Sequence, residues 1–451
     1  MKRLNLLYAL TISTLILNPA QGQDVYPEPD PPVAIDVQGF ALLDAEVDSY
    51  IRVVRARDRF GVTGSGLTVA VIDSGINTAH VDFQGKLVPG KNFSTAGGDS
   101  DVMDTNGHGS NVAGIIAGKN VTKGGMHTGI AFDANIAALK VFPGGQFSRI
   151  NNALQWVLDN AVTQHISVVN MSLGNSANVT NDSGITFADL ATQRELISQL
   201  RANNIAVVVS AGNGYFSSNS QQGMSMPGIF KDTISVGAIY DTDIQRNPDN
   251  SPLVSYVDGG TVNFAVQNRC TVFSQRLGSQ VGGEFRTDIF SPGFIVTSAG
   301  PVKRNNDGTI DSVGSARSET TQDGTSQAGP VVAGVVLLLQ ERFQKINATL
   351  GRPANELPPV ALIESCIFNG GTEFVDVEDD IAMQMDNVIA CGATFRSVDA
   401  LGALVAMDES FRGEVMRTQA AAFTNAKGLN TLTPTSINKA NLFKGFKEGQ
   451  R

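Results

Sequence analysis

LTVAVIDSG, residues 67–75, is the stretch that decides the fold of this chain. Its first six residues are almost all apolar and do not alternate with polar ones, which is typical of a strand buried on both faces of a parallel sheet. The run then ends in Asp73, a serine and a glycine, so a carboxylate stands at the carboxyl end of the strand. Functional residues gather at that edge of such sheets, which makes Asp73 a candidate site residue.

The same pattern recurs four times along the chain. The later strand candidates are NIAALKVF, ISVVNMSLG, IAVVVSAGNG and DTISVGA. Helical patterns lie before and between the strands, in AEVDSYIRVVRARDRF, GHGSNVAGIIAG, SRINNALQWVLDNAV and FADLATQRELISQLRANN. Strands that alternate with helices predict an α/β fold, here a three-layer, doubly wound, mostly parallel sheet with helices on both faces.

Composition narrows the class of protein. With 42% apolar and 17% charged residues among 451, the chain is an ordinary globular protein rather than a mainly disordered one. A net charge of -10 argues against a nucleic-acid partner. We expect a monomer.

The N-terminus predicts export. Lys2 and Arg3 precede an apolar run over residues 4–17, and the small residues Ala20 and Gly22 follow, as in a signal peptide over residues 1–22. A membrane anchor is the alternative, but a span needs about 20 apolar residues and this run is shorter. We therefore expect a secreted or periplasmic protein that does not associate with a membrane after the signal is removed.

The rest of the chain divides by composition. The predicted segments are a proline-rich stretch at 23–44, a main domain at 45–407 with insertions near 243–268 and 367–394, and a C-terminal tail at 408–451. A solvated tail is the expected form, and a docking or sorting tail is the alternative.

The three cysteines leave the disulfide state open. In an exported protein Cys366 and Cys391 could pair while Cys270 stays buried and reduced, but an odd count does not decide this. No CxxC or Cys/His cluster indicates zinc.

Two further residues are candidates for acid–base and nucleophilic chemistry. His108 lies in DTNGHGSNVAG, where glycines on both sides allow close approach of backbone and substrate, unlike the settings of the other three histidines. Ser326 lies in DGTSQAGPVVAGVVLLL, residues 323–339, where a tight turn runs into a buried helix. A helix N-cap is the ordinary interpretation of such a serine.

Amide hydrolysis by a serine needs a base, an anion that orients the base, and donors for the oxyanion. Together with Ser326, the chain offers His108, Asp73 and, in SAGN, the side-chain amide of Asn213. The motifs VAVIDSGI, NGHGSNVAG, NMSLG, SAGN and DGTSQAGP resemble, in this order, those of the subtilisin-like serine proteases, the subtilase or peptidase S8 family. The order Asp, His, Ser is also the order of the subtilisin triad.

The resemblance implies a serine endopeptidase that forms an acyl-enzyme on Ser326. His108 would act as general base and then acid, Asp73 would orient it, and Asn213 with the backbone N–H of Ser326 would hold the oxyanion. A polypeptide substrate would lie extended between residues 172–174 and 143–146. The predicted pocket residues are Ser172, Leu173, Gly174, Ser210, Ala211 and Gly212, with a neutral floor near Ser225.

The chain departs from the family pattern at two positions. Asn111 stands where the motif usually has a second histidine, and Gln327 follows Ser326 where methionine is usual. No cofactor is needed for the chemistry. Structural calcium is common in the family and Asp82 matches a position that often binds it, although an ordinary surface carboxylate is the alternative.

Two other functions are compatible with the same residues. One is a catalytically silent module that keeps the fold for binding, which the presence of all four candidate residues disfavours. The other is a serine esterase, which the absence of a G-x-S-x-G elbow disfavours.

Overall fold

The computed structural model describes residues 43–119, 128–183, 185, 187–377 and 385–426. The strands are β1 (Thr68–Asp73), β2 (Lys91–Asn92), β3 (Asn135–Lys140), β4 (Ile166–Met171), β5 (Ala206–Ser210), β6 (Ile234–Ile239), β7 (Val254–Ser255), β8 (Thr261–Val262), β9 (Ile289–Pro292), β10 (Val296–Ala299), β11 (Glu319–Gln322), β12 (Thr372–Val375) and β13 (Thr394–Ser397). The helices are α1 (Leu43–Tyr50), α2 (Val53–Phe60), the short 3₁₀ helix η1 (Val81–Phe83), α3 (His108–Ala117), α4 (Phe147–Gln164), α5 (Ala188–Ala202), α6 (Ser279–Gly282), α7 (Ser312–Ala316), α8 (Thr325–Thr349), α9 (Val360–Gly370) and α10 (Ala400–Ala426).

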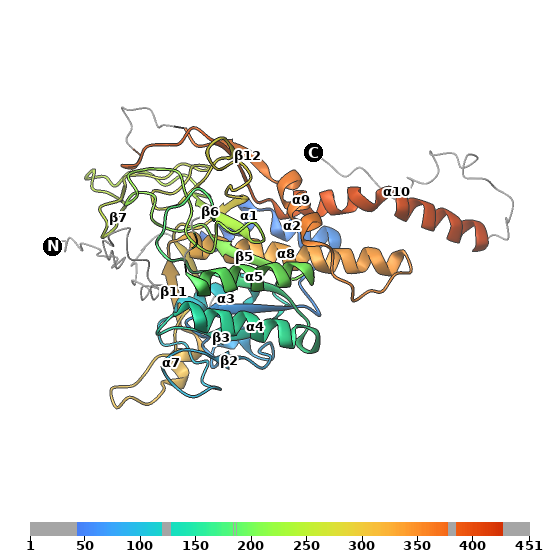
Figure 1. The fold of residues 1–451 in the computed structure, drawn as a ribbon, viewed down its shortest axis with the longest axis horizontal. Coiled ribbons are helices and arrows are strands. Elements are labelled where there is room, and N and C mark those ends of the chain that lie inside the picture. The colour runs from blue at the N-terminus through green and yellow to red at the C-terminus, as the bar shows by residue number, and fades with distance from the viewer. Residues whose placement is uncertain (1–42, 120–127, 184, 186, 378–384, 427–451) are drawn as a thin grey trace.

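A nine-stranded sheet forms the centre of the described chain. Its strand order is β12-β13-β9-β6-β5-β4-β1-β3-β2, and every neighbouring pair is parallel except β12 with β13. Helices α4 and α5 lie on one side of the sheet, as the green helices of Figure 1 show, and α3 and α8 lie on the other. The predicted three-layer α/β fold is therefore confirmed.

The apolar strand pattern follows from burial on both faces. Along β1, Val69 and Val71 pack in the core beneath α3 and α8, while Ala70 and Ile72 pack in the core beneath α4 and α5. Side chains alternate between the two faces of a strand, so a strand with a helix layer on each face has no position for an exposed polar residue.

The helices near the two ends of the described chain differ from those that the sequence predicts. The predicted N-terminal helix is broken into α1 and α2 at Arg52, whose φ is 57°. At the other end α10 is one continuous helix to Ala426, so it runs past residue 407, where the sequence places the end of the main domain. The predicted signal peptide, the proline-rich segment up to residue 42 and residues 427–451 of the tail lie outside the described residues.

The two predicted insertions contact one another. Residues 243–268 contain the β7–β8 hairpin, and their side chains Tyr256 and Val262 are buried in the same core as α8. Asn263 donates its backbone N–H to the carbonyl of Met385 in the second insertion at 2.7 Å. The first insertion therefore contributes to the core rather than only to the surface.

The sequence leaves the disulfide state open, and in the structure all three cysteines are free thiols, so Cys366 and Cys391 do not pair. Cys366 on α9 packs in the core beneath α8, whereas Cys270 and Cys391 lie in or against a separate cluster around Phe290. Cys366 and Cys391 are thus held in different parts of the core. Within the described ranges, no helix combines the length and the apolar character that a membrane span requires.

Candidate active site

Asp73 and His108 meet at the carboxyl edge of the sheet. Asp73 is the last residue of β1 and is 1% exposed, and His108 is the first residue of α3. Nδ1 of His108 lies 2.8 Å from Oδ1 and 3.0 Å from Oδ2 of Asp73. Oδ1 of Asp73 also accepts the backbone N–H of Ser74 at 2.6 Å, which fixes the orientation of the carboxylate.

A glycine makes this contact possible. A Cβ on Gly109 would stand 2.3 Å from the carbonyl oxygen of Gly75 and 3.1 Å from Oδ1 of Asp73. Any larger residue after His108 would therefore push the start of α3 away from the end of β1. This is the close approach expected from the glycines beside His108.

Asp104 organises the turn before His108. Its Oδ1 accepts the backbone N–H groups of Asn106 at 3.0 Å and Gly107 at 2.8 Å, and its Oδ2 accepts both N–H and Oγ–H of Ser110, at 2.9 and 2.6 Å. It also accepts a hydrogen bond from Ser74 Oγ. Sequence reasoning missed this residue, although an aspartate shortly before a helix start is a typical capping signal.

Ser326 is the second residue of α8, the helix that begins at Thr325. Its Oγ donates to the carbonyl of Ser172 at 3.3 Å. Pro330 is the sixth residue of this helix and cannot donate the N–H that would bond the carbonyl of Ser326. Ser172 Oγ supplies that bond instead, at 2.8 Å, so the end of β4 holds the first turns of the helix.

Asn213 is oriented by Thr325. Its Oδ1 accepts the backbone N–H of Thr325 at 2.9 Å and the Thr325 hydroxyl at 2.8 Å, which turns Nδ2 the other way. A Cβ on Gly324 would stand 3.2 Å from Nδ2 of Asn213 and 3.4 Å from the backbone nitrogen of Ser326. The two predicted oxyanion donors therefore lie on the same side of Gly324.

The predicted pocket residues follow β4 and β5. The hydroxyls of Ser172 and Ser210 donate to the carbonyls of Ser326 and Thr325, so these side chains support α8. Leu173 and Ala211 are buried, while Gly174 and Gly212 are partly exposed.

Ser225 lies beneath the two glycines. Cβ atoms on Gly174 and Gly212 would stand 2.4 and 2.9 Å from Ser225 Oγ, and Gly212 also adjoins the side chain of Gln275. The predicted floor residue is thus next to the predicted walls, and uncharged hydroxyl and amide groups surround this point.

Asp82 lies in η1 and is 2% exposed. Its Oδ2 is 3.9 Å from Nδ1 of His80. In the part of the chain that the structure describes, no three His, Cys, Asp or Glu side chains group so as to hold a metal ion. Calcium takes six to eight oxygen ligands, backbone and amide carbonyls among them, so a calcium site at Asp82 stays a prediction. Residues 120–127 lie outside the described residues.

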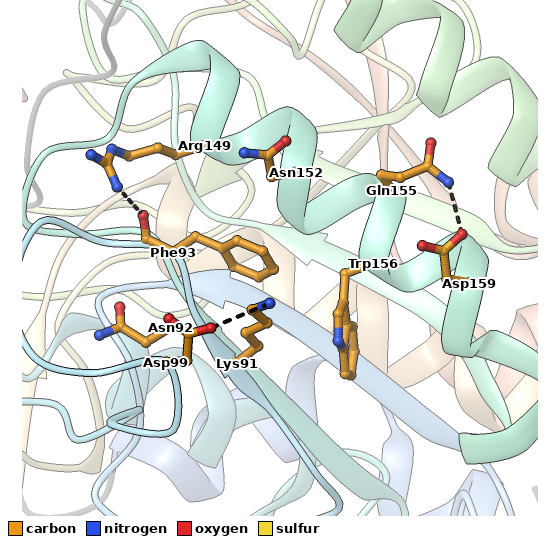
Figure 2. Close-up of a pocket in the computed structure, with 9 residues that line it drawn as sticks. All are labelled: Lys91, Asn92, Phe93, Asp99, Arg149, Asn152, Gln155, Trp156 and Asp159. Carbon is orange, nitrogen blue, oxygen red and sulfur yellow. Dashed lines mark hydrogen bonds and ion pairs between the residues drawn. The ribbon is translucent and has the colours of Figure 1, made fainter.

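A separate hollow of about 400 Å³ lies between β2 and α4 (Figure 2). It is lined by Lys91, Asn92, Phe93, Asp99, Arg149, Asn152, Gln155, Trp156 and Asp159. Two of its charged side chains pair with each other, since Lys91 Nζ lies 3.6 Å from Asp99 Oδ2, and the same Nζ lies 5.5 Å from the ring centre of Phe93. None of the predicted site residues lines this hollow, so it is distinct from the candidate active site.

Known proteins resemble this chain in sequence and in fold. A sequence profile of the subtilase family matches residues 64–355. Over 202 residues the chain is 32% identical to the major intracellular serine protease of Bacillus subtilis, covering 43% of this chain and 58% of that protein. Over 321 residues it is 29% identical to subtilisin DY of Bacillus licheniformis, covering 70% of this chain and 92% of that protein.

A solved structure of proteases from Pseudoalteromonas arctica has the same fold. It matches with a TM-score of 0.53 at 22% identity, and the match covers 80% of this chain and 97% of that one. The profile match spans well over half of the 451 residues, so this chain belongs to the subtilase family of serine-type endopeptidases.

Proposed function

We propose that this protein is an exported serine endopeptidase with Asp73, His108 and Ser326 as its catalytic triad. The observation that carries the proposal is the arrangement at the start of α8. There the backbone N–H of Ser326 and Nδ2 of Asn213 lie together beside Gly324, and neither donates a hydrogen bond to another described residue. Two such donors beside a serine at a helix N-terminus are suited to stabilise an oxyanion.

In the proposed reaction, rotation of the Ser326 side chain turns Oγ from the Ser172 carbonyl towards His108. As Oγ bonds to the substrate carbonyl carbon, its proton passes to Nε2 of His108, and Asp73 stabilises the imidazolium through Nδ1. The oxyanion is held by Asn213 and the Ser326 N–H. Collapse breaks the C–N bond and the proton passes from Nε2 to the leaving amine.

In the second half of the reaction, water takes the place of Ser326 as the attacking group and Ser326 becomes the leaving group. Water attacks the acyl carbon and gives one proton to Nε2 of His108. The ester C–O bond then breaks, the carboxylic acid leaves, and Ser326 Oγ takes the proton back. Two acyl-transfer steps replace one difficult hydrolysis, and no metal takes part in either.

The proposed substrate is an extended polypeptide. Its backbone would pair with residues 172–174 and 143–146, as an added strand pairs with a sheet edge. The uncharged surroundings of Ser225 support a preference for neutral side chains in the primary pocket. Export rests on the predicted signal peptide, and mass spectrometry of the protein recovered outside the cytoplasm should find a new N-terminus close to Gly22.

A fluorophosphonate probe tests the enzymatic proposal. The wild-type protein should be labelled on Ser326 and should hydrolyse casein, and Ser326→Ala should do neither. Ser410→Ala changes a serine on α10 and should behave as the wild type. Failure of the wild type to react would favour the silent binding module, and reaction with a p-nitrophenyl ester but not with casein would favour the esterase.

A further inference from the structure

The two departures from the family pattern touch each other. Nε2 of Gln327, the residue after Ser326, donates to Oδ1 of Asn111 at 3.2 Å. The two residues are 216 positions apart and are 1% and 0% exposed. Asn111 lies three residues after His108 in α3, so this bond joins the helix of the base to the helix of the nucleophile.

A third amide completes the connection. Gln327 Nε2 also donates to Oε1 of Gln322 at 3.2 Å. Gln322 in turn donates through Nε2 to the carbonyl of Gly107 at 3.3 Å, and Asn111 donates through Nδ2 to the carbonyl of Thr320 at 2.9 Å. The three side chains thus form a buried amide network between β11, α3 and α8.

The ends of the amide network determine the orientation of every amide in it. A backbone carbonyl only accepts hydrogen bonds, so Asn111 and Gln322 must point their nitrogens at Thr320 and Gly107 and their oxygens at Gln327. Gln327 must therefore present its nitrogen to both oxygens. Its own Oε1 has no hydrogen-bond partner within the described part of the chain and lies 2.9 Å from where a Cβ on Gly324 would stand, beside the proposed oxyanion donors.

We infer that Gln327 is a positioning residue that sets the distance between His108 and Ser326 through this amide network. The inference rests on the proposed function. A buried network whose members are paired holds its elements in one arrangement, and the loss of one member leaves the others unsatisfied. Because a small displacement of a catalytic group can cost a large factor in rate, the effect should appear in kcat.

Gln327→Met is the decisive variant, because it nearly conserves volume and removes both donated hydrogen bonds. We expect kcat for a peptide p-nitroanilide, per active site titrated with a fluorophosphonate, to fall about tenfold while KM stays nearly unchanged. Gln322→Ala removes only one link and should cause a smaller loss of kcat.

Gln340→Met is the matched control. Gln340 is a second buried glutamine on α8, and its Nε2 donates to the carbonyl of Ser167 at 3.0 Å, far along the helix from Ser326. Loss of this hydrogen bond should lower the melting temperature without changing kcat per titrated site. A purely structural role for Gln327 would give the same result as this control, and that outcome would overturn the inference.

A double-mutant cycle separates this inference from the proposed function. Asn111→Leu, Gln327→Met and the double variant are compared by melting temperature in the inactive Ser326→Ala background. The melting temperature of the double variant should fall by less than the sum of the two single decreases, because each single change leaves the other partner unsatisfied. Additive losses would overturn the amide network itself. If the cycle shows coupling but the wild type does not react with the probe, the proposed function fails and the positioning role fails with it.

Discussion

The hydroxyl of Tyr256 donates a hydrogen bond of 2.9 Å to Oδ2 of Asp323. Asp323 lies three residues before Ser326, and Tyr256 belongs to the insertion at 243–268. The other carboxylate oxygen of Asp323 accepts the backbone N–H of Ile295. The insertion is therefore attached directly to the turn that carries Ser326, the proposed nucleophile.

Tyr256→Phe removes this hydroxyl and leaves Oδ2 of Asp323 without its donor. We expect the variant to lose about 1–3 kcal/mol of unfolding free energy at pH 8, where the carboxylate is ionised, and less at pH 5. Urea unfolding in the Ser326→Ala background, which prevents self-digestion, measures the difference. An equal loss at both pH values would contradict this explanation.

Asp323 makes stability depend on pH. Burial raises the pKa of its carboxyl from 3.8 to about 6, against the effect of its two hydrogen bonds. The folded state thus holds this proton more tightly than the unfolded state. The stability that the protonated Asp323 contributes is therefore full below pH 3.8 and is lost as the pH rises through 6. Asp323→Asn should gain stability relative to the parent protein between pH 4 and pH 7, and a constant difference would refute this.

Lys86 should make the stability of the folded protein depend on pH in the alkaline range. Burial lowers its pKa from 10.5 to about 7, and its ammonium donates to the carbonyls of Ala117 and Phe132. Below pH 7 Lys86 is charged in both states, and burying its charge lowers the free energy of unfolding by the full amount. Between pH 7 and 10.5 the folded state releases this proton while the unfolded state keeps it, so the free energy of unfolding rises with pH. The parent protein should therefore gain stability relative to Lys86→Met over this range, and melting curves at pH 7, 8.5 and 10 test it.

Asn213→Asp keeps an acceptor for Thr325 but removes the amide donor. We expect kcat to fall by at least about 10²–10³ with little change in KM, since an oxyanion donor acts only in the transition state. Thermal unfolding of the variant serves as the control for folding. Retention of most of the wild-type kcat would exclude Asn213 from the oxyanion hole.

Arg276 is a buried cation that lies against a carboxylate and an aromatic ring. It is 1% exposed, its Nε lies 3.2 Å from Oδ2 of Asp376, and its guanidinium lies 3.6 Å from the ring centre of Tyr215. Arg276→Met would leave the buried Asp376 carboxylate without its counter-charge, although its Oδ2 still accepts the N–H of Cys391, and this should cost about 3–5 kcal/mol of unfolding free energy. Adding Asp376→Asn should recover part of this loss in urea titrations, and no recovery would show that the ion pair is not the cause.

Local sequence was sufficient to predict several elements and their ends. The apolar run before Asp73 predicts a buried strand, and the turn before Ser326 predicts a helix start, because both depend on neighbouring residues only. The break at Arg52 was not predictable, since the helical pattern continues through it. The role of the Ser172 hydroxyl was not predictable either. It donates to the carbonyl of Ser326, 154 positions away, in place of the N–H that Pro330 lacks.

The sequence by itself determined the buried parallel strands, the polar residues at their ends and the order of the family motifs. These depend on periodicity and on residue type, which are local properties. Only the tertiary structure decided that Gln327 bonds Asn111 and that Tyr256 bonds Asp323. Such pairs are set by which strand ends and helix starts meet at one edge of the sheet, and a polar side chain carries no local signal of its distant partner.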